Sequence, residues 1–322
     1  MSKKPLRIID LFAGIGGLRL GFESVADTNC VFSSEWDKAA QKVYEANFGE
    51  KPFGDINEIP PKDIPDHDIL LAGFPCQAFS IAGKQLGFAD TRGTLFFNIE
   101  KIIKAKRPRA FLLENVKRLK THDAERTFKV IKERLEGLGY IVYDTILNSL
   151  NFGVPQKRER IYIVGFNPKV QFRYPEPLGY YKPLLEVLET NVPEKYFATK
   201  KIQEKRKEKV KTVPSGDSIW HENIGGNISA LPYSCALRAG GSYNYLLVNG
   251  VRRLTGREML RLQGYKDDFI INVPYTQIRK LAGNSVTVPV IEMLAKNIIN
   301  ALKKNQQAVI AEQVELELHE LS

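Results

Sequence analysis

The first 166 residues alternate short apolar runs with longer amphipathic segments, and this alternation strongly constrains the fold. Six runs rich in Ile, Val, Leu and Phe have the length of strands, and they cover residues 7–12, 30–35, 68–74, 110–116, 143–148 and 160–166. Such nearly continuous hydrophobicity is typical of strands buried on both faces. The amphipathic segments between the runs predict helices. The pattern therefore indicates βαβ units with a largely parallel sheet, and so an α/β domain.

Several segments outside these runs have helical features. Asp37 can cap a helix that continues to Asn47. Residues 123–138 place four apolar side chains on one face, and residues 290–303 repeat that spacing. The acidic segment 312–320 is predicted to be a solvated terminus.

A second, smaller and loop-rich domain is predicted in the last half of the chain. Four prolines lie close together after Asn167, and residues 181–279 show little helical periodicity before 255–263. We expect a catalytic domain formed by residues 1–180 plus 280–322, and a second domain with its hinge at 181–279.

The charge balance points to an acidic partner. There are 47 Lys and Arg residues against 37 Asp and Glu, a formal net charge of +10, which suits binding to nucleic acid. The 3 cysteines are far apart and include no zinc-type pair, so we expect a reducing compartment and no metal. The sequence shows neither a signal peptide nor an uninterrupted apolar run of about 20 residues. We therefore expect a cytoplasmic protein with no membrane contact.

A glycine-containing loop after the first strand predicts a nucleoside site. The segment 10–17 reads Asp-Leu-Phe-Ala-Gly-Ile-Gly-Gly, but Arg19 stands where the dinucleotide fingerprint needs a third glycine. Glu35 ends the second strand, where an acid can bind ribose hydroxyls, and Trp36 can stack on a base. Asp55 is placed to accept a hydrogen bond from an adenine amine. S-adenosylmethionine, a nucleoside without a pyrophosphate, meets these requirements.

Reactive side chains follow the ends of the next strands. Cys76 lies in a Gly-Phe-Pro-Cys-Gln segment at the carboxyl end of a buried strand, the edge at which open α/β sheets bind ligands. Glu114 ends the neighbouring strand and should place a carboxyl group beside the thiol. Arg158 and Arg160 point to the same side of a later strand by alternation. Without Glu114 and the two arginines, a lone cysteine would be interpreted as a small buried apolar residue.

Taken in order, these segments resemble the cytosine-5 DNA methyltransferases of bacterial restriction-modification systems. The matching motifs are the loop 10–17, Pro-Cys-Gln at 75–77, Glu-Asn-Val at 114–116, Gln-x-Arg-x-Arg at 156–160, the segment 252–265, and Gly-Asn-Ser-Val at 283–286. Each motif is weak by itself, but six in the family order are specific. The resemblance implies a Rossmann-like S-adenosylmethionine-dependent methyltransferase domain with a smaller target-recognition domain.

The resemblance also implies roles for individual residues. Cys76 would be the nucleophile, Glu114 the acid at cytosine N3 and Arg160 the donor to cytosine O2, with Arg158 supporting the site. The S-adenosylmethionine pocket would be lined by Phe12, Ile15, Gly17, Glu35, Trp36, Asp55, Ile56, Pro75, Leu95, Asn284 and Val286. The loop that closes on DNA would contain Ser80, Lys84 and Arg92.

The implied reaction explains these residue types. Cytosine C5 is a poor nucleophile, so a thiolate adds to C6 and the resulting enamine can attack the methyl group of S-adenosylmethionine, leaving S-adenosylhomocysteine. A neutral carboxylic acid at N3 relieves the charge that develops on the ring. A base stacked in double-stranded DNA cannot be reached in this way, so the cytosine must be flipped out. We expect a monomer that acts on the bacterial nucleoid, with a paired restriction endonuclease as a functional partner.

Two features of the second domain leave its DNA contacts open. Residues 200–211 carry seven cations, which form either a phosphate-facing patch or an ordinary solvated helix. The family commonly has Thr before an aliphatic residue in the recognition domain, whereas this chain has Ala236 before Leu237. A phosphate-contacting hydroxyl would then be missing. We expect base readout from residues 212–245.

Three other functions compete with this interpretation. A tRNA cytosine methyltransferase would share the same core, although the sizeable recognition region favours DNA. A catalytically silent DNA-binding regulator would have no need to retain Cys76, Glu114 and the glycine loop together. A nicotinamide enzyme is disfavoured because the phosphate fingerprint fails.

Overall fold

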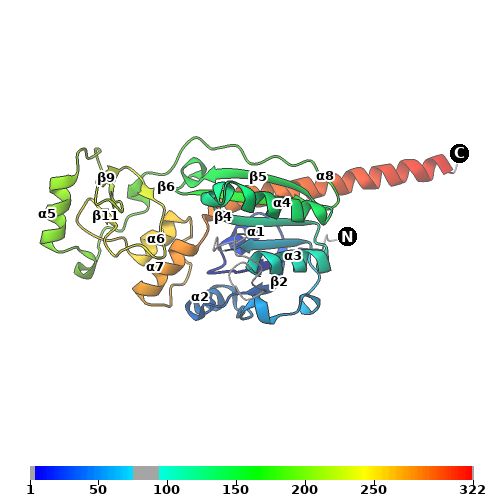
Figure 1. Cartoon of the computed structure of the whole chain (residues 1–322), viewed down its shortest axis with the longest axis horizontal. Coiled ribbons are helices and arrows are strands. Elements are labelled where there is room, and N and C mark those ends of the chain that lie inside the picture. Colours follow the sequence, from blue (N-terminus) through cyan, green and yellow to red (C-terminus); the bar gives the residue numbers. More distant parts are fainter. Residues whose placement is uncertain (1–3, 75–93, 321–322) are drawn as a thin grey trace.

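The computed structural model describes residues 4–74 and 94–320 of the chain. A body built around a six-stranded sheet occupies one part of the molecule, and a smaller region that contains α5 and the β9 hairpin lies at the opposite end from the chain termini (Figure 1). The predicted α/β architecture with a second, loop-rich region is confirmed.

The six predicted strands all belong to the main sheet. They are β1 (Leu6–Leu11), β2 (Thr28–Ser34), β3 (Ile69–Gly73), β4 (Ala110–Val116), β5 (Ile141–Asn148) and β7 (Glu159–Phe166), in the order β2-β1-β3-β4-β7-β5. Strands β2, β1, β3 and β4 pair in parallel, whereas β7 is antiparallel to both β4 and β5. The carboxyl ends of β1, β3 and β4 consequently meet at the edge where the amino end of β7 lies.

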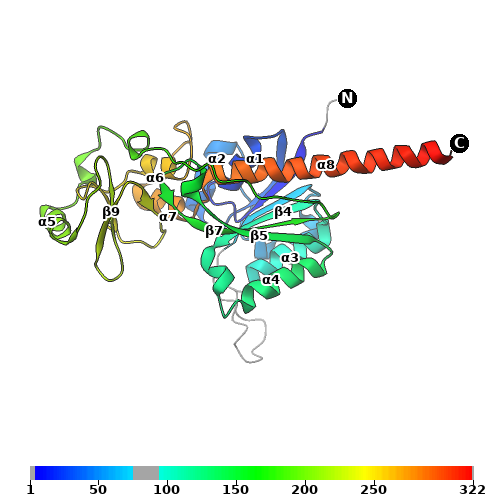
Figure 2. The ribbon, with the colours of Figure 1, turned by 90° about the horizontal axis from the view of Figure 1, so that it is seen from above.

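Helices cover both faces of this sheet, and further helices belong to the second region. The α-helices of the described residues are α1 (Gly17–Glu23), α2 (Lys38–Phe48), α3 (Thr94–Lys106), α4 (Arg126–Gly137), α5 (Lys200–Lys209), α6 (Gly256–Leu262), α7 (Tyr275–Asn284) and α8 (Val288–Glu320). Apolar side chains of α1 and α8 form one core with the sheet, and those of α3 and α4 form a second core on its other face. Figure 2 shows these two helix pairs on opposite sides of the strands.

Helix boundaries follow local chemistry. Asp37 caps α2 as predicted, since its carboxylate accepts hydrogen bonds from the backbone N–H groups of Ala39 and Ala40. The predicted helix 123–138 begins only at Arg126, because residues 123–125 have positive φ angles of 50–69° and cannot join a right-handed helix.

The C-terminal helix is longer than predicted. The pattern at 290–303 gave only the part of α8 that packs on the sheet, whereas the helix continues to Glu320 and projects away from the body (Figure 1). Residues 303–320 are rich in Ala, Glu, Lys, Gln and Leu, which favour a helix without tertiary contacts. The prediction of a merely solvated terminus missed this intrinsic preference.

The second region is built around a small antiparallel sheet. Its strands are β8 (Ile219–Glu222), β9 (Ile228–Leu231) and β11 (Leu246–Val248), while β10 (Ser234–Cys235) pairs in parallel with β6 (Gln156–Lys157). A third apolar core joins this region to Ala40 and Val43 of α2 through α6 and α7. The second region is therefore packed directly against the first.

Helix α5 exposes most of its cations. Arg206 is the exception, because it is buried and its guanidinium donates to Trp220 O at 3.3 Å and to Glu222 Oε2 at 2.9 Å. A phosphate-facing patch on this helix therefore cannot include Arg206.

One stretch of helix is apolar enough to be tested as a membrane span. Within the described residues, Tyr275–Gln307 contains an 18-residue window with a mean hydropathy of 1.2, and 67% of that window is buried inside the protein. Its buried residues include Val290, Ile291 and Leu294 of α8, which pack under the sheet. The window therefore has the burial expected of a core helix.

A substitution at Gly165 tests the packing of the sheet. A Cβ atom at this position would lie 2.0 Å from the Phe111 ring, so we expect Gly165→Ala to lower the free energy of unfolding by about 1–3 kcal/mol. Gly137→Ala is the matched control, because the added Cβ atom meets nothing within 4 Å. Since this substitution replaces a glycine of helix α4 with alanine, it should raise the free energy of unfolding by about 0.5–1 kcal/mol. Urea unfolding of both variants checks this prediction, and equal stability changes would contradict it.

Candidate active site

A cavity of about 550 Å³ lies at the carboxyl ends of the parallel strands. Its wall is formed by the loops after β1, β2, β3 and β4, by the start of β7, and by the last residues of α7. Cavities of this size are typical of sites for small molecules, and this sheet edge is where open α/β folds bind their ligands. The topology thus brings segments that are far apart in the sequence to one place.

The glycine loop and Glu35 form one wall of the cavity. Gly14 and Gly16 have φ angles of +56° and +83°, so the chain can turn tightly after β1. The backbone N–H groups of Gly14 and Asp37 donate to the two oxygens of Glu35, at 2.8 and 2.7 Å. Burial raises the pKa of Glu35, while these donors reduce that rise. The carboxyl group is thereby fixed in orientation at the cavity wall.

Trp36 and Asp55 lie at the same wall. The Trp36 side chain lines the cavity yet is 75% exposed, which leaves its ring open for stacking. Asp55 accepts hydrogen bonds from the backbone and side-chain nitrogens of Asn57, at 2.9 and 2.7 Å. Asn57 also lines the cavity, and it was not predicted from the sequence because no motif marks it.

Glu114 occupies the end of β4, as predicted. The parallel register pairs Glu114 with Gly73 of β3, and the antiparallel register pairs Val116 with Arg160 of β7. Arg160 Nε therefore comes within 3.1 Å of Glu114 Oε1. Burial raises the pKa of Glu114, although the charges of Arg160 and Arg158 oppose the rise. The site consequently contains a largely desolvated carboxyl group whose pKa lies above its ordinary value.

Asn115 links β4 to the end of β3. Its side-chain Nδ2 donates to the Phe74 carbonyl oxygen at 2.9 Å, and both residues line the cavity. Phe74 directly precedes the Pro75-Cys76 segment, so this hydrogen bond fixes the direction in which the chain leaves the sheet. The sequence motif contained Asn115, but this contact depends on the pairing of β3 with β4.

Arg158 is buried and binds backbone oxygens. Its two terminal nitrogens donate to Leu237 O at 3.1 Å, to Gly283 O at 3.2 Å and to Ser285 O at 2.5 Å. Burial lowers its pKa to about 10. Arg158 therefore joins the second region to the loop after α7, a structural role that sequence alternation could not show.

The predicted site residues fall into three groups. Those that line the cavity are Phe12, Glu35, Trp36, Asp55, Ile56, Leu95, Glu114, Arg158, Arg160 and Asn284. Pro75, Cys76, Ser80, Lys84 and Arg92 lie outside the described residues. Ile15, Gly17 and Val286 are buried and are not among the residues that line the cavity.

Packing explains the three residues of the last group. Ile15 joins the apolar core around Ala40 and Val43, and Val286 joins the core under the sheet. A Cβ at Gly17 would lie 2.6 Å from Tyr265 Oη, so glycine is required there for close packing of α1. These three residues therefore serve packing.

Lys280 and Asp37 were not predicted as site residues. Both line the cavity, and Lys280 Nζ donates to Asp37 Oδ2 at 2.7 Å, which joins α7 to the start of α2. Burial opposes ionisation of Asp37, but the hydrogen bonds from Lys280 and from the α2 backbone outweigh it and lower the pKa. The only sequence signal was the proximity of Lys280 to the Gly-Asn-Ser-Val motif.

Comparisons with known proteins agree with this geometry. Residues 6–300 match the family described as C-5 cytosine-specific DNA methylase. The chain is 69% identical over 292 residues to the Type II methyltransferase M.NgoBI of Neisseria gonorrhoeae, covering 90% of this chain and 92% of that protein. It is 68% identical over 302 residues to the Type II methyltransferase M.HaeII of Haemophilus aegyptius, covering 93% and 94%.

A solved structure shares the fold at much lower sequence identity. A mutant of Spodoptera frugiperda DNMT2 has a TM-score of 0.72 and 23% identity, and the match covers 91% of this chain and 99% of that one. The likeness thus extends over both the sheet and the second region.

Replacement of Arg158 tests how far the stability of the site depends on this buried guanidinium. We expect Arg158→Ala to lower the free energy of unfolding by about 3 kcal/mol, because three buried carbonyl oxygens lose a charged donor. The exposed Arg118 provides the control, and Arg118→Ala should change stability by less than about 0.5 kcal/mol. Urea unfolding measures both, and a loss of similar size in the two variants would contradict the structural role.

Proposed function

The chain belongs to the family of C-5 cytosine-specific DNA methylases, and we propose that it transfers a methyl group from S-adenosylmethionine to C5 of a flipped-out cytosine within a specific sequence of double-stranded DNA. The observation that carries this proposal is the pair Glu114 and Arg160, which are 3.1 Å apart at the wall of the cavity. An acid and a donor at this distance suit the N3 and O2 positions of one cytosine ring.

The cavity suits S-adenosylmethionine as the methyl donor. Glu35 is fixed by two backbone donors and keeps lone pairs for ribose hydroxyls, while the open ring of Trp36 can stack on adenine. Asp55 and Ile56 lie beside them on the wall. Arg19, which stands where the dinucleotide fingerprint needs a third glycine, agrees with a nucleoside ligand that has no pyrophosphate. When bound, the cofactor supplies an electrophilic methyl group and leaves as S-adenosylhomocysteine.

The protein groups would act in sequence on the cytosine. The Cys76 thiolate adds to C6 and forms the S–C6 bond, which makes C5 nucleophilic. Glu114 donates its proton, or a hydrogen bond, to N3, and Arg160 holds O2. C5 then takes the methyl group. A base removes the C5 proton, the thiolate leaves as the S–C6 bond breaks, and any proton that N3 took returns to Glu114. Arg158 orients this edge through its contacts with backbone oxygens.

We further propose that double-stranded DNA binds between the catalytic residues 1–180 plus 280–322 and a target-recognition domain at 181–279. The net charge of +10 favours such binding, and contacts of the second domain would offset the few kcal/mol needed to flip a base. Ser80, Lys84 and Arg92 are assigned to the DNA-closing loop, and the exposed lysines of α5 are candidates for phosphate contacts. Loss of the hydroxyl at Ala236 leaves the chemistry intact.

The relatives named as Type II methyltransferases suggest the biological setting. We propose that this enzyme protects bacterial DNA from a paired restriction endonuclease, acting as a monomer in the cytoplasm.

Cys76→Ser tests the reaction and its nucleophile. The protein and the variant are incubated with methyl-labelled S-adenosylmethionine and either duplex DNA or tRNA, and the labelled nucleoside is identified after digestion. We expect label in 5-methyldeoxycytidine with the unmodified protein and at least about a hundredfold less with Cys76→Ser, because the covalent step is lost. Cys30→Ser is the control, since Cys30 is buried away from the cavity. Label in tRNA alone, or equal activity of the Cys76 variant, would overturn the proposal.

Glu114→Gln tests the acid. The raised pKa lets Glu114 keep its proton above its ordinary value of 4.5, so kcat should fall as the pH rises through that raised pKa. The variant should lose about a hundredfold in kcat and also this limb of the pH profile. Glu159→Gln is the control, because Glu159 pairs with Lys117 and does not line the cavity. An unchanged pH profile of kcat in Glu114→Gln would contradict the role of Glu114 as the acid.

A further inference from the structure

Residues 236–243 of the second region, here called the 236–243 loop, lie directly against the end of α7. A Cβ atom at Gly283 would come within 2.4 Å of the backbone nitrogen of Ala239 and 2.7 Å of the carbonyl carbon of Arg238. Gly283 also lines the cavity. Only the backbone of α7 therefore separates the loop from the proposed cofactor site at this point.

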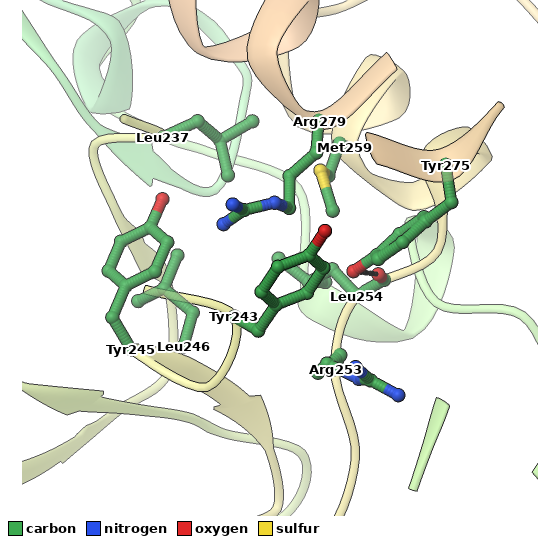
Figure 3. A pocket seen from close by; sticks show the side chains of 9 residues that line it. All are labelled: Leu237, Tyr243, Tyr245, Leu246, Arg253, Leu254, Met259, Tyr275 and Arg279. Atoms are coloured by element: carbon green, nitrogen blue, oxygen red, sulfur yellow. Dashed lines mark hydrogen bonds between the residues drawn. The ribbon is translucent and has the colours of Figure 1, made fainter. Parts of the chain in front are cut away.

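Arg279 of α7 holds the far end of the loop. Its Nη1 donates to Gly241 O at 2.7 Å and to Ser242 O at 3.2 Å, and its guanidinium carbon lies 4.3 Å from the centre of the Tyr243 ring. Figure 3 shows the guanidinium reaching from the helix towards Tyr243, with Tyr245 and Leu237 on its other side. The Nε atom is buried and has no hydrogen-bond partner among the described residues. A planar cation that both stacks and spans two carbonyls fixes the loop more tightly than lysine would.

The near end of the loop is held by Arg158, which donates to Leu237 O and to Gly283 O. The 236–243 loop is thus attached to α7 at both ends by arginines. Neither contact belongs to a regular strand or helix pairing, so these side chains contribute to the position of the loop, together with the hydrogen bond from Leu237 N to Gln156 Oε1.

The same helix presents different residues to the cavity. Adjacent residues on an α-helix point about 100° apart, so Arg279 can face the loop while Lys280 faces Asp37 at the cavity wall. Leu281, Gly283 and Asn284 also line the cavity. Any displacement of α7 by the loop would therefore move this wall.

The outer surface of the loop has groups that suit DNA. Arg238 and Ser242 are exposed, and Tyr243 is 43% exposed. Cations and hydroxyls are the usual donors to phosphate oxygens. The loop can therefore contact DNA on one side while its other side rests on α7.

We propose that Arg279 is a positioning residue that couples DNA binding at the 236–243 loop to cofactor binding in the cavity through α7. The inference rests on the proposed function, since it needs DNA and the cofactor as the two ligands. Coupling of this kind is reciprocal and commonly changes affinity by about 5–150-fold.

The experiment measures the dissociation constant of S-adenosylhomocysteine by calorimetry, with and without a saturating duplex that contains the sequence methylated by the unmodified protein. In that protein, DNA should tighten binding by at least about fivefold. In Arg279→Ala this ratio should fall below about twofold, while binding of S-adenosylhomocysteine alone changes by less than about twofold, because Arg279 does not line the cavity.

Two further variants distinguish the stacking and two-carbonyl contacts of Arg279 from its positive charge and from a general loss of stability. Arg279→Lys keeps the cation, so DNA affinity should stay within about twofold of the unmodified protein while the coupling remains lost. Arg257→Ala is the matched control, since Arg257 also donates to two carbonyls, Lys266 O and Phe269 O, but holds a different loop. It should leave the coupling unchanged.

The outcomes distinguish this inference from the proposed function. Absence of label on DNA overturns both. Methylation of DNA without any coupling in the unmodified protein overturns the inference alone, as does full coupling in Arg279→Ala. Full coupling in Arg279→Lys would assign the effect to charge. It would also contradict the claim that coupling needs the stacking and two-carbonyl contacts of Arg279.

Discussion

The buried carboxyl group of Glu114, held beside Arg160 at the end of β4, is the interaction around which the site is built. Its surroundings follow from strand register: β3 pairs with β4 in parallel, and β7 runs antiparallel on the other side. This one reversed strand brings Arg160 to the edge where the parallel strands end. A fully parallel sheet would place the start of β7 at the opposite edge, and the carboxyl group would be buried without a cation.

Backbone oxygens define much of the remaining site. Arg158 binds carbonyls of two distant segments, and Gln156 adds hydrogen bonds to Leu262 O and from Leu237 N, each at 2.9 Å. Two of the three specified residues of the Gln-x-Arg-x-Arg motif thus join the two regions of the chain, while Arg160 faces the proposed substrate. Residues of one short motif consequently have different physical roles.

The two regions are best understood as parts of one structure. The apolar core formed by α6 and α7 includes residues of α2, and the boundary expected at 279/280 falls inside α7. Because α7 packs on one region and lines the cavity of the other, binding at the proposed DNA surface can influence the proposed cofactor site without a separate hinge. This continuity is the basis of the role proposed for Arg279.

The sequence alone determined the order of strands along the chain, the cap of α2 and the acid at the end of β4, because hydrophobic period and capping chemistry are local properties. Tertiary structure decided that Ile15, Gly17 and Val286 serve packing, that Arg158 binds carbonyls and that Lys280 pairs with Asp37. Side-chain direction at these positions depends in some cases on neighbours that are hundreds of residues away, such as Asp37 and Lys280, which are 243 positions apart. No local pattern records such contacts, since they arise only when the sheet and its covering helices have assembled.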